Sequence, residues 1–203
     1  MIVVVNYGVG NLGSIENMIK KAGGKAEISS DKKIIEKAEK LILPGVGAFD
    51  NGMKKLEESG LIPALNKKVH DEKIPILGIC LGMQLMLNKS EEGKMNGLGW
   101  IDGEALKFRF EKDSKLKVPH MGWNRIYPKQ DSYLFNDMYK EPRFYFVHGY
   151  YVKCNNEKNL LAQTHFGFDF TSAVVKENIL GTQFHPEKSH KFGLKLMQNF
   201  INN

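Results

Sequence analysis

Residues 76–84 read Ile-Leu-Gly-Ile-Cys-Leu-Gly-Met-Gln, an apolar run that passes at Cys80 into a helical pattern. Residues 76–79 have the composition of a buried strand, and residues 81–87 have that of a helix. Gly78 and Gly82 stand two positions before and after the cysteine. A tight strand-to-helix turn crowds the backbone, and glycine removes the β-carbons that would collide there. The stretch therefore predicts an α/β fold with a sharp corner at Cys80.

The rest of the chain divides into two halves with different patterns. The first half alternates short apolar runs with segments of helical spacing. Further strands are predicted at 2–5, 25–28 and 41–43, and helices at 11–22, 53–56 and 61–69. After Gly99 strands predominate, at 105–110, 143–148, 160–164, 170–176 and 179–184. Residues 189–202 are predicted as a final helix, which Ser189 can cap.

This order of elements predicts the fold class. Alternating strands and helices favour a parallel sheet covered on both faces, and the strand-rich section favours antiparallel hairpins that extend it. We therefore expect a single domain over residues 1–203. Its architecture is predicted to be a three-layer α/β fold with a mostly parallel, flavodoxin-like central sheet and an antiparallel extension.

Composition and charge narrow the class of protein. The 203 residues are 42% hydrophobic and 26% charged, as in ordinary globular proteins. No apolar stretch approaches the ~20 residues that span a bilayer, and no signal peptide is evident. The net charge is +6, but only three of the 29 basic residues are arginine. These features predict a cytoplasmic protein that binds neither membrane nor nucleic acid.

A glycine-rich segment near the N-terminus offers one alternative function. Gly8-Val-Gly10-Asn-Leu-Gly13 follows a strand and opens a helix, which is the pattern of a dinucleotide-binding turn. Asp31 lies where a ribose-binding acid is sought, although it follows Ser29-Ser30, beyond the second strand. A nucleotide-binding module therefore stands as an alternative, and a simple glycine turn explains the same residues.

Cys80 is the candidate nucleophile. The predicted corner places its thiol at the carboxyl edge of the sheet, where ligands collect in open α/β folds. The backbone N–H of Leu81 would face an oxyanion, and Gln84 lies on the same helical face. The alternative is a buried cysteine that acts as a small hydrophobic residue. The other cysteine, Cys154, lies in a polar turn, and the two cysteines predict no disulfide framework.

His185 and Glu187 complete a possible catalytic set. Pro186 keeps His185 in extended backbone, where residues two apart project to the same side. The carboxylate can then hold one imidazole nitrogen and leave the other for Cys80. A thiol, an imidazole and an orienting carboxylate form an activated nucleophile. Alternatively, the pair flanks a surface turn. No His/Cys cluster has the spacing of a metal site.

Several motifs together resemble a known family. Residues 78–84 with Phe184-His-Pro-Glu187 resemble the triad (class I) glutamine amidotransferases. Within that family, the chain resembles the glutaminase subunits of imidazole glycerol phosphate synthase. The motifs that indicate this are Asn6-Tyr-Gly-Val-Gly-Asn11, Pro44-Gly-Val-Gly47, Pro119-His-Met-Gly-Trp-Asn124 and Phe146-Val-His148. The resemblance covers nearly the whole chain and implies the class I glutamine amidotransferase fold.

The resemblance also implies a reaction. Cys80 would attack the side-chain amide of L-glutamine, with His185 transferring protons and Glu187 orienting it. Backbone N–H groups of Leu81 and of Val46 or Gly47 would form the oxyanion hole. The pocket would include Gly47, Gln84, His148, Gly149 and Tyr150. Gly149 departs from the serine or threonine usual in the family, so a hydroxyl contact with the substrate is missing.

The implied partner is a (β/α)8-barrel cyclase that receives the ammonia in histidine biosynthesis. Asn11, Trp123 and Asn124 would lie in the interface of this heterodimer, or Trp123 is plain core. The resemblance implies no cofactor, and the lone subunit is expected to be slow. Gly149 and the ending Ser189-His-Lys-Phe-Gly193 leave an alternative open, in which the ammonia serves a paralogous synthase that amidinates a surface sugar.

Overall fold

The computed structural model describes residues 1–111 and 113–203. Its first half contains the strands β1 (Ile2–Val5), β2 (Ala26–Ser29), β3 (Lys40–Leu43) and β4 (Ile76–Ile79). The helices between and after them are α1 (Leu12–Lys21), α2 (Lys32–Glu36), α3 (Phe49–Glu58), α4 (Ile62–Asn66) and α5 (Leu81–Leu85). A π-helical turn at Lys67–Asp71 continues α4.

The second half is rich in strands, as predicted. These are β5 (Lys89–Ser90), β6 (Gly103–Lys107), β7 (His120–Arg125), β8 (Tyr127–Pro128), β9 (Arg143–His148), β10 (Tyr150–Cys154), β11 (Leu160–Phe166), β12 (Phe168–Lys176) and β13 (Ile179–Thr182). The chain ends in helix α6 (His190–Asn202).

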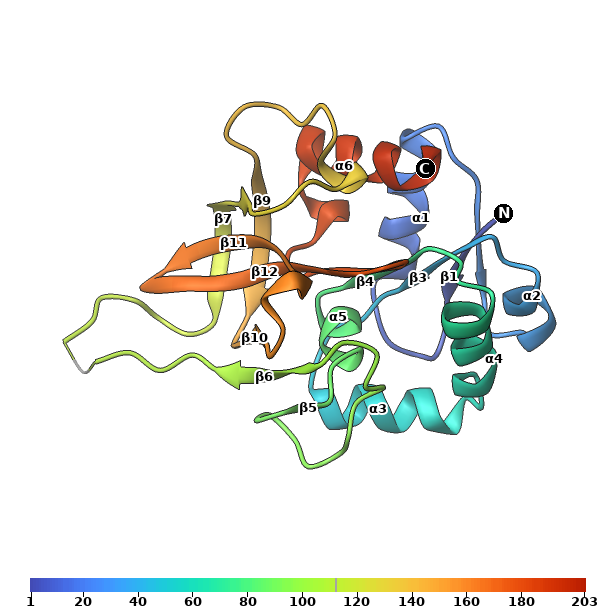
Figure 1. Cartoon of the computed structure of the whole chain (residues 1–203), viewed down its shortest axis with the longest axis horizontal. Helices are drawn as coiled ribbons and strands as arrows, with labels where there is room; N and C mark the ends of the chain where they lie inside the picture. The colour runs from blue at the N-terminus through green and yellow to red at the C-terminus, as the bar shows by residue number, and fades with distance from the viewer. Residues whose placement is uncertain (112) are drawn as a thin grey trace.

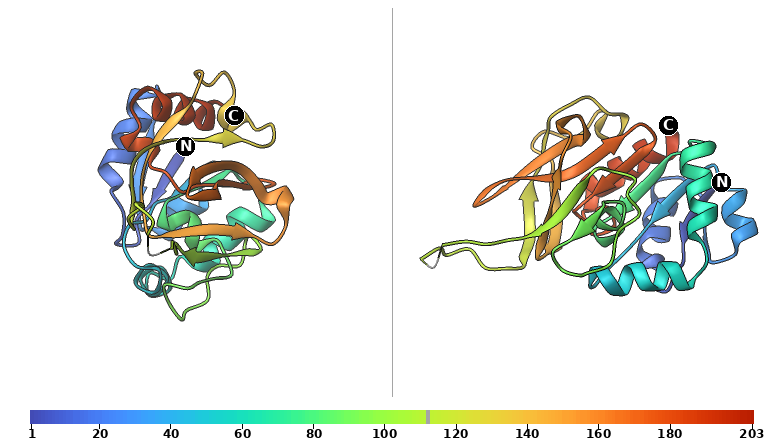
Figure 2. Two further views of the ribbon diagram at one scale, coloured as in Figure 1. Left: turned by 90° about the vertical axis from the view of Figure 1, so that its left-hand side faces the viewer. Right: turned by 60° about the horizontal axis from the view of Figure 1, so that its bottom comes forward.

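The central sheet lies between two layers of helices, with α1 and α6 on one face and α3, α4 and α5 on the other (Figures 1 and 2). Successive residues of a strand enter opposite cores. Val3 and Val5 pack toward α3 and α4, whereas Ile2 and Val4 pack toward α1 and α6. Because both faces are covered, β1 and β4 carry no polar residue at any position, which explains their continuous hydrophobic runs.

The strand order confirms a mostly parallel sheet with an antiparallel extension. The order among the described residues is β2-β1-β3-β4-β13-β12-β10-β6-β5. From β2 to β13 every neighbouring pair is parallel, and β12, β10 and β6 follow antiparallel. Gly78 of β4 pairs with Gly181 of β13, so the carboxyl ends of these two strands lie side by side.

One part of the predicted extension was wrong. Residues 143–148 form β9, but β9 pairs with β7 in a separate two-stranded ribbon. The sequence did not reveal β7 as a strand, because its six residues form no apolar run and, apart from His120, are partly or largely exposed. Phe144 and Phe146 of β9 anchor the ribbon in the core on the α6 side.

Several predicted boundaries also change. The strand predicted at 105–110 ends at Lys107, and that predicted at 179–184 ends at Thr182. Helix α2 was not predicted. Asp31, considered above as a ribose ligand, instead caps α2, because its carboxylate accepts a hydrogen bond of 2.8 Å from the N–H of Lys33.

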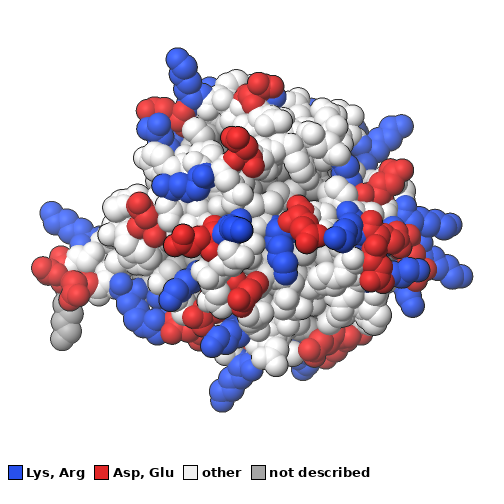
Figure 3. Space-filling view, viewed as in Figure 1, with Lys and Arg blue, Asp and Glu red and all other residues white. Residues whose placement is uncertain are grey.

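The surface carries mixed charge. On the face shown in Figure 3, lysines and arginines are interspersed with aspartates and glutamates, so the net positive charge is not gathered into one patch there. No helix in the described ranges has both the length and the apolar character required to cross a membrane.

Candidate active site

The corner between β4 and α5 has an unusual backbone conformation. Cys80 has φ 54° and ψ −111°, a region that non-glycine residues avoid at a cost of about 1–3 kcal/mol. The surrounding backbone holds it there. Its N–H donates to Thr182 O at 2.7 Å, and its carbonyl accepts from the N–H groups of Met83 and Gln84 at 3.1 and 3.2 Å. The strain therefore presents the thiol at the sheet edge.

The two glycines that flank Cys80 are required by close backbone contacts. A β-carbon at Gly78 would lie 2.8 Å from the backbone nitrogen of Met83. A β-carbon at Gly82 would overlap the carbonyl oxygen of Leu43 at the end of β3. The loop after β3 is packed as tightly, because a β-carbon at Gly45 would lie 2.8 Å from the nitrogen of Gly82. The corner and this loop can therefore pack this closely only because Gly78, Gly82 and Gly45 have no side chain.

His185 follows β13 in extended backbone, with φ −102° and ψ 96°. Its Nδ1 lies 2.7 Å from Oε1 of Glu187, and both side chains are 2% exposed. Ser189 secures this turn: its hydroxyl donates to His185 O at 2.6 Å and accepts from the N–H of Tyr145 at 3.0 Å. The prediction that the Ser189 side chain caps α6 was wrong, because the hydroxyl is used in these two bonds.

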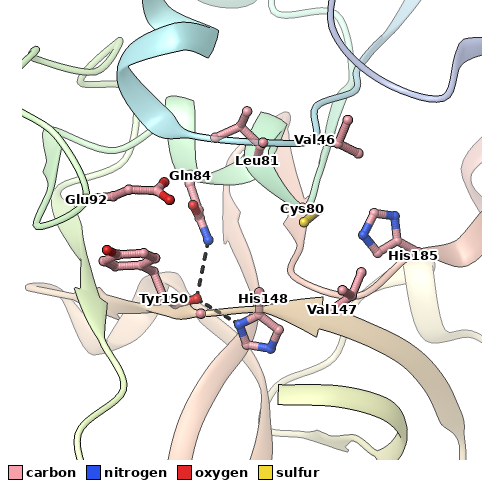
Figure 4. A pocket seen from close by; sticks show the side chains of 11 residues that line it. Val46, Cys80, Leu81, Gln84, Glu92, Val147, His148, Tyr150 and His185 are labelled. Atoms are coloured by element: carbon pink, nitrogen blue, oxygen red, sulfur yellow. Dashed lines mark hydrogen bonds between the residues drawn. The ribbon is translucent and has the colours of Figure 1, made fainter. Parts of the chain in front are cut away.

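The charges around His185 favour its protonated form. Burial lowers its pKa, but the neighbouring Cys80 and the hydrogen-bonded carboxylate of Glu187 outweigh burial and raise the pKa to about 10. Nε2 makes no close hydrogen bond to the described residues and is left for the neighbouring Cys80 sulfur (Figure 4). A protonated imidazole therefore lies beside the Cys80 sulfur.

A cavity of about 190 Å³ opens beside the sulfur. It is lined by Val46, Gly47, Cys80, Leu81, Gln84, Glu92, Val147, His148, Gly149, Tyr150 and His185. All the residues expected to form the oxyanion hole and the substrate pocket line it. Glu187 lies behind His185, outside the cavity. The volume of the cavity is below the roughly 300 Å³ of the smallest pockets that bind drug-sized ligands. The cavity therefore favours a small substrate.

Two features of the pocket bear on its chemistry. Leu81 is the first residue of α5, so its N–H has no partner within the helix. On the opposite chain segment, Val46 is 44% exposed and Gly47 has φ 96°, a conformation that favours glycine. Backbone donors from both segments can therefore reach the cavity beside the sulfur.

Sequence reasoning missed Glu92, Val147 and Gln183. Glu92 lies in the turn after β5, and its Oε2 accepts from the N–H of Phe49 at 2.9 Å. It lines the cavity from a segment far from the triad in the sequence, and no local pattern marks it. Gln183 is completely buried, and its Nε2 lies 3.7 Å from the Cys80 sulfur. Its position beside Phe184-His-Pro-Glu187 was the signal that could have found it.

The expected interface residues lie outside the cavity. Asn11 is exposed at the start of α1, and Trp123 on β7 is 46% exposed. Trp123 is therefore not plain core. Asn124 is partly buried, and its Nδ2 lies 2.9 Å from His165 O and 3.1 Å from His120 Nε2. Its amide nitrogen is therefore committed within the chain.

The remaining sequence candidates supply no second site. Gly10 packs against Pro44, and Asp31 caps α2, so the glycine-rich turn supports the loop after β3. Among the described residues, no group of three His, Cys, Asp or Glu side chains is placed to hold a metal ion.

Comparisons with known proteins agree with this geometry. The family model of glutamine amidotransferase class-I matches residues 3–203. The chain is 56% identical to imidazole glycerol phosphate synthase subunit HisH 2 of Methanococcus maripaludis, with 99% of this chain and 98% of that protein covered. It is 49% identical to subunit HisH 2 of Pseudomonas aeruginosa, with the same coverage.

Solved structures show the same fold at low sequence identity. The structure of PurLQS from Thermotoga maritima matches with a TM-score of 0.74 at 18% identity, covering 99% of this chain and 97% of that one. The family match extends over the segments that supply the corner, the imidazole and the cavity. The chain therefore belongs to the class-I glutamine amidotransferase family.

Proposed function

We propose that the chain is the glutaminase subunit of an imidazole glycerol phosphate synthase and acts in histidine biosynthesis. It hydrolyses L-glutamine to glutamate and ammonia within a single amidotransferase domain. The observation that carries the proposal is the buried set of Cys80, His185 and Glu187 beside a small cavity. The relatives named HisH support the choice of pathway.

The reaction begins with the thiolate–imidazolium pair. The Cys80 sulfur attacks the amide carbon, the C–S bond forms, and the carbonyl electrons move to oxygen. As the C–N bond breaks, His185 Nε2 gives its proton to the leaving ammonia. Nε2 then takes a proton from water, which attacks the thioester, and the C–S bond breaks to restore the thiolate and imidazolium. Glu187 holds Nδ1, and so keeps Nε2 directed at the reacting atoms.

The negative oxygen formed in each step needs fixed donors. The N–H of Leu81 and a backbone N–H from Val46 or Gly47 are placed on the cavity wall to supply them. One such donor is commonly worth about 3–4 kcal/mol in the barrier. The position of the loop that carries Val46 therefore controls the rate.

The polar groups of the cavity match a free amino acid. The carboxylate of Glu92 can attract the α-ammonium group of glutamine, because it is the acidic side chain on the cavity wall. Main-chain groups of His148, Gly149 and Tyr150 can hold the α-carboxylate. Gly149 brings no hydroxyl, so this end of the substrate relies on backbone contacts.

We infer that the partner is a (β/α)8-barrel cyclase, which receives the ammonia and docks over the ribbon of β7 and β9. Exposed Met121 and Trp123 supply apolar contact area for it. The nucleophile requires a reduced thiol, and this favours the cytoplasm as the site of action.

The proposal is tested by two assays. The chain with its cyclase should release ammonia from glutamine, and Cys80→Ala should abolish release; ammonia production by Cys80→Ala contradicts the mechanism. Rescue of a histidine auxotroph lacking this subunit tests the pathway. Failure of rescue by a pair that is active as a glutaminase would instead support the paralogous synthase acting on a surface sugar.

A further inference from the structure

The side chain of Gln183 joins the nucleophile to the substrate pocket. It follows β13 directly and is completely buried. Its backbone N–H donates to Ser172 O at 2.9 Å, which fixes the residue at the end of the strand. Its Nε2 lies 3.7 Å from the Cys80 sulfur, and its Oε1 accepts from Gln84 Nε2 at 2.9 Å. Neither end of the amide is solvated.

Neighbouring groups determine which end of this amide faces the sulfur. The carbonyl oxygen of Tyr150 can only accept a hydrogen bond, and it lies 3.3 Å from Gln84 Nε2. The nitrogen end of Gln84 is therefore directed at both Tyr150 and Gln183. The atom of Gln183 that meets this nitrogen must be its oxygen, so its N–H groups face Cys80. A flipped Gln183 amide would place two donors against each other.

The Tyr150 carbonyl is itself held in place by a chain of side chains. His148 Nδ1 donates to Tyr150 O at 2.7 Å, which leaves His148 Nε2 as an acceptor for His120 Nδ1 at 3.0 Å. His120 Nε2 in turn accepts from Asn124 Nδ2 at 3.1 Å. Every link has one permitted direction, since the chain begins at an amide NH₂ and ends at a carbonyl. The polarity of the Gln183 amide is thus built into the fold.

We propose that Gln183 is a further catalytic residue, whose N–H donates to the Cys80 sulfur and stabilises it as the thiolate. A hydrogen bond to an ionised acceptor is roughly twice as strong as one to a neutral acceptor, so the donor favours the thiolate over the thiol. Gln183 lies within hydrogen-bond distance of this sulfur, and it keeps a donor there when His185 has given its proton away. The inference rests on the proposed glutaminase function.

The experiment measures the alkylation of Cys80 by iodoacetamide as a function of pH, in a Cys154→Ser background so that one thiol reacts. Gln183→Met keeps the length of the side chain and removes the donor. Gln183→Glu replaces the donor with a negative charge. We expect alkylation at pH 7 to slow by about 3–10-fold in the first variant and by more than about tenfold in the second, with the pH midpoint moving upward. Unchanged midpoints in both would overturn the proposal.

A matched control separates this role from general damage to the fold. Asn199→Asp makes the same amide-to-acid change at another buried side chain, which donates to Leu134 O and Asn136 O on α6's side of the molecule. It should lower the melting temperature and leave the alkylation midpoint unchanged. A shift in this control equal to that of Gln183→Glu would also overturn the proposal.

A measurement on the unsubstituted protein covers the case in which the variants fail to fold. The side-chain NH₂ signals of Gln183 should move with pH at the same midpoint as the alkylation rate, and signals that do not move contradict the proposal. Alkylation needs neither glutamine nor the cyclase. A protein that shows these shifts but releases no ammonia would therefore refute the glutaminase function and leave the thiolate donor in place.

Discussion

The corner at Cys80 and the ribbon of β7 and β9 border the same cavity, yet they are built in different ways. Cys80, Leu81 and His185 are buried, and the backbone beside Cys80 is packed so closely at Gly78 and Gly82 that neither position has space for a β-carbon. On the ribbon, Met121 and Trp123 are 62% and 46% exposed. The corner is complete within one chain, whereas the ribbon presents large apolar side chains without cover, as an interaction surface does.

This difference suggests separate roles: the corner carries out the reaction, and the ribbon is where a partner can influence it. The groups that bear charge in the reaction are held by the fold of the lone chain, so their removal should act on every measured rate. The ribbon contributes His148 to the cavity from its buried face and Val147 from the face that also carries exposed Met121 and Trp123. A partner that covers the exposed face can therefore alter the cavity without touching the nucleophile.

The largest expected effect breaks the corner itself. Gly82→Ala should destabilise the protein by more than about 4 kcal/mol, because its β-carbon would overlap backbone at Leu43 that cannot retreat. Gly122→Ala on the ribbon has open space, and should cost only about 1–2 kcal/mol of strain at φ 124°. Urea unfolding measures both, and equal losses would contradict the contrast between the two regions.

The next effect concerns the triad carboxylate. Glu187→Gln should lower the turnover of glutamine by about 10²–10³-fold, because the carboxylate no longer orients and stabilises the imidazolium of His185. The control is Glu157→Gln, an exposed carboxylate at the far end of the extension, which should leave turnover unchanged. A variant with full turnover would show that Glu187 is not part of the active set.

Glu187→Gln should also change how the turnover of glutamine depends on pH. The raised pKa of His185 keeps it protonated up to about pH 10. The stabilisation gained from its partners is present below pH 6.5 and is lost as the pH rises through about 10. In Glu187→Gln the alkaline decline of activity should begin at lower pH. An unchanged alkaline limb would contradict this.

A smaller effect tests His120 and His148, the paired histidines on the buried face of the ribbon. Burial lowers the pKa of His120 to about 4 and that of His148 to about 3. The folded protein keeps both neutral while the unfolded chain binds protons, so stability should fall as the pH drops from about 6.5 toward 4. His120→Gln should reduce this loss by up to about 1.4 kcal/mol per pH unit, measured by urea unfolding. His70→Gln, at an exposed histidine, should not.

The smallest expected effect on the stability of the lone chain comes from a tryptophan of the ribbon, which can be compared with a tryptophan of the core. Trp123→Ala should change stability by less than about 1 kcal/mol and leave basal ammonia release unchanged, but weaken cyclase binding by about 2 kcal/mol or more. Trp100 is 1% exposed, and Trp100→Ala should cost about 3–5 kcal/mol of stability. Calorimetric titration with the cyclase measures the first; undiminished binding would remove Trp123 from the interface.

Much of the catalytic corner could be predicted because its signals are local. Gly78, Cys80 and Gly82 encode a turn within five residues. The contact of His185 with Glu187 was also predicted, but the reason given was wrong, because Glu187 lies in a 3-10 turn at Pro186–Lys188 and not in extended backbone. The pairing partner of residues 143–148 could not be predicted, since β7 lacks an apolar run. Glu92 was missed for a related reason: its place in the cavity depends on the packing of its turn against the start of α3.

The sequence alone determined the class of fold and predicted a nucleophile with its proton-transfer partners, because strand and helix periodicity and a glycine-flanked turn are properties of neighbouring residues. Only the tertiary structure decided which groups meet across the sheet. The parallel pairing of β4 with β13 brings Cys80 to His185 and Gln183 from more than a hundred positions away. The direction of each amide there follows from carbonyls and imidazoles of other segments, which no stretch of sequence encodes by itself.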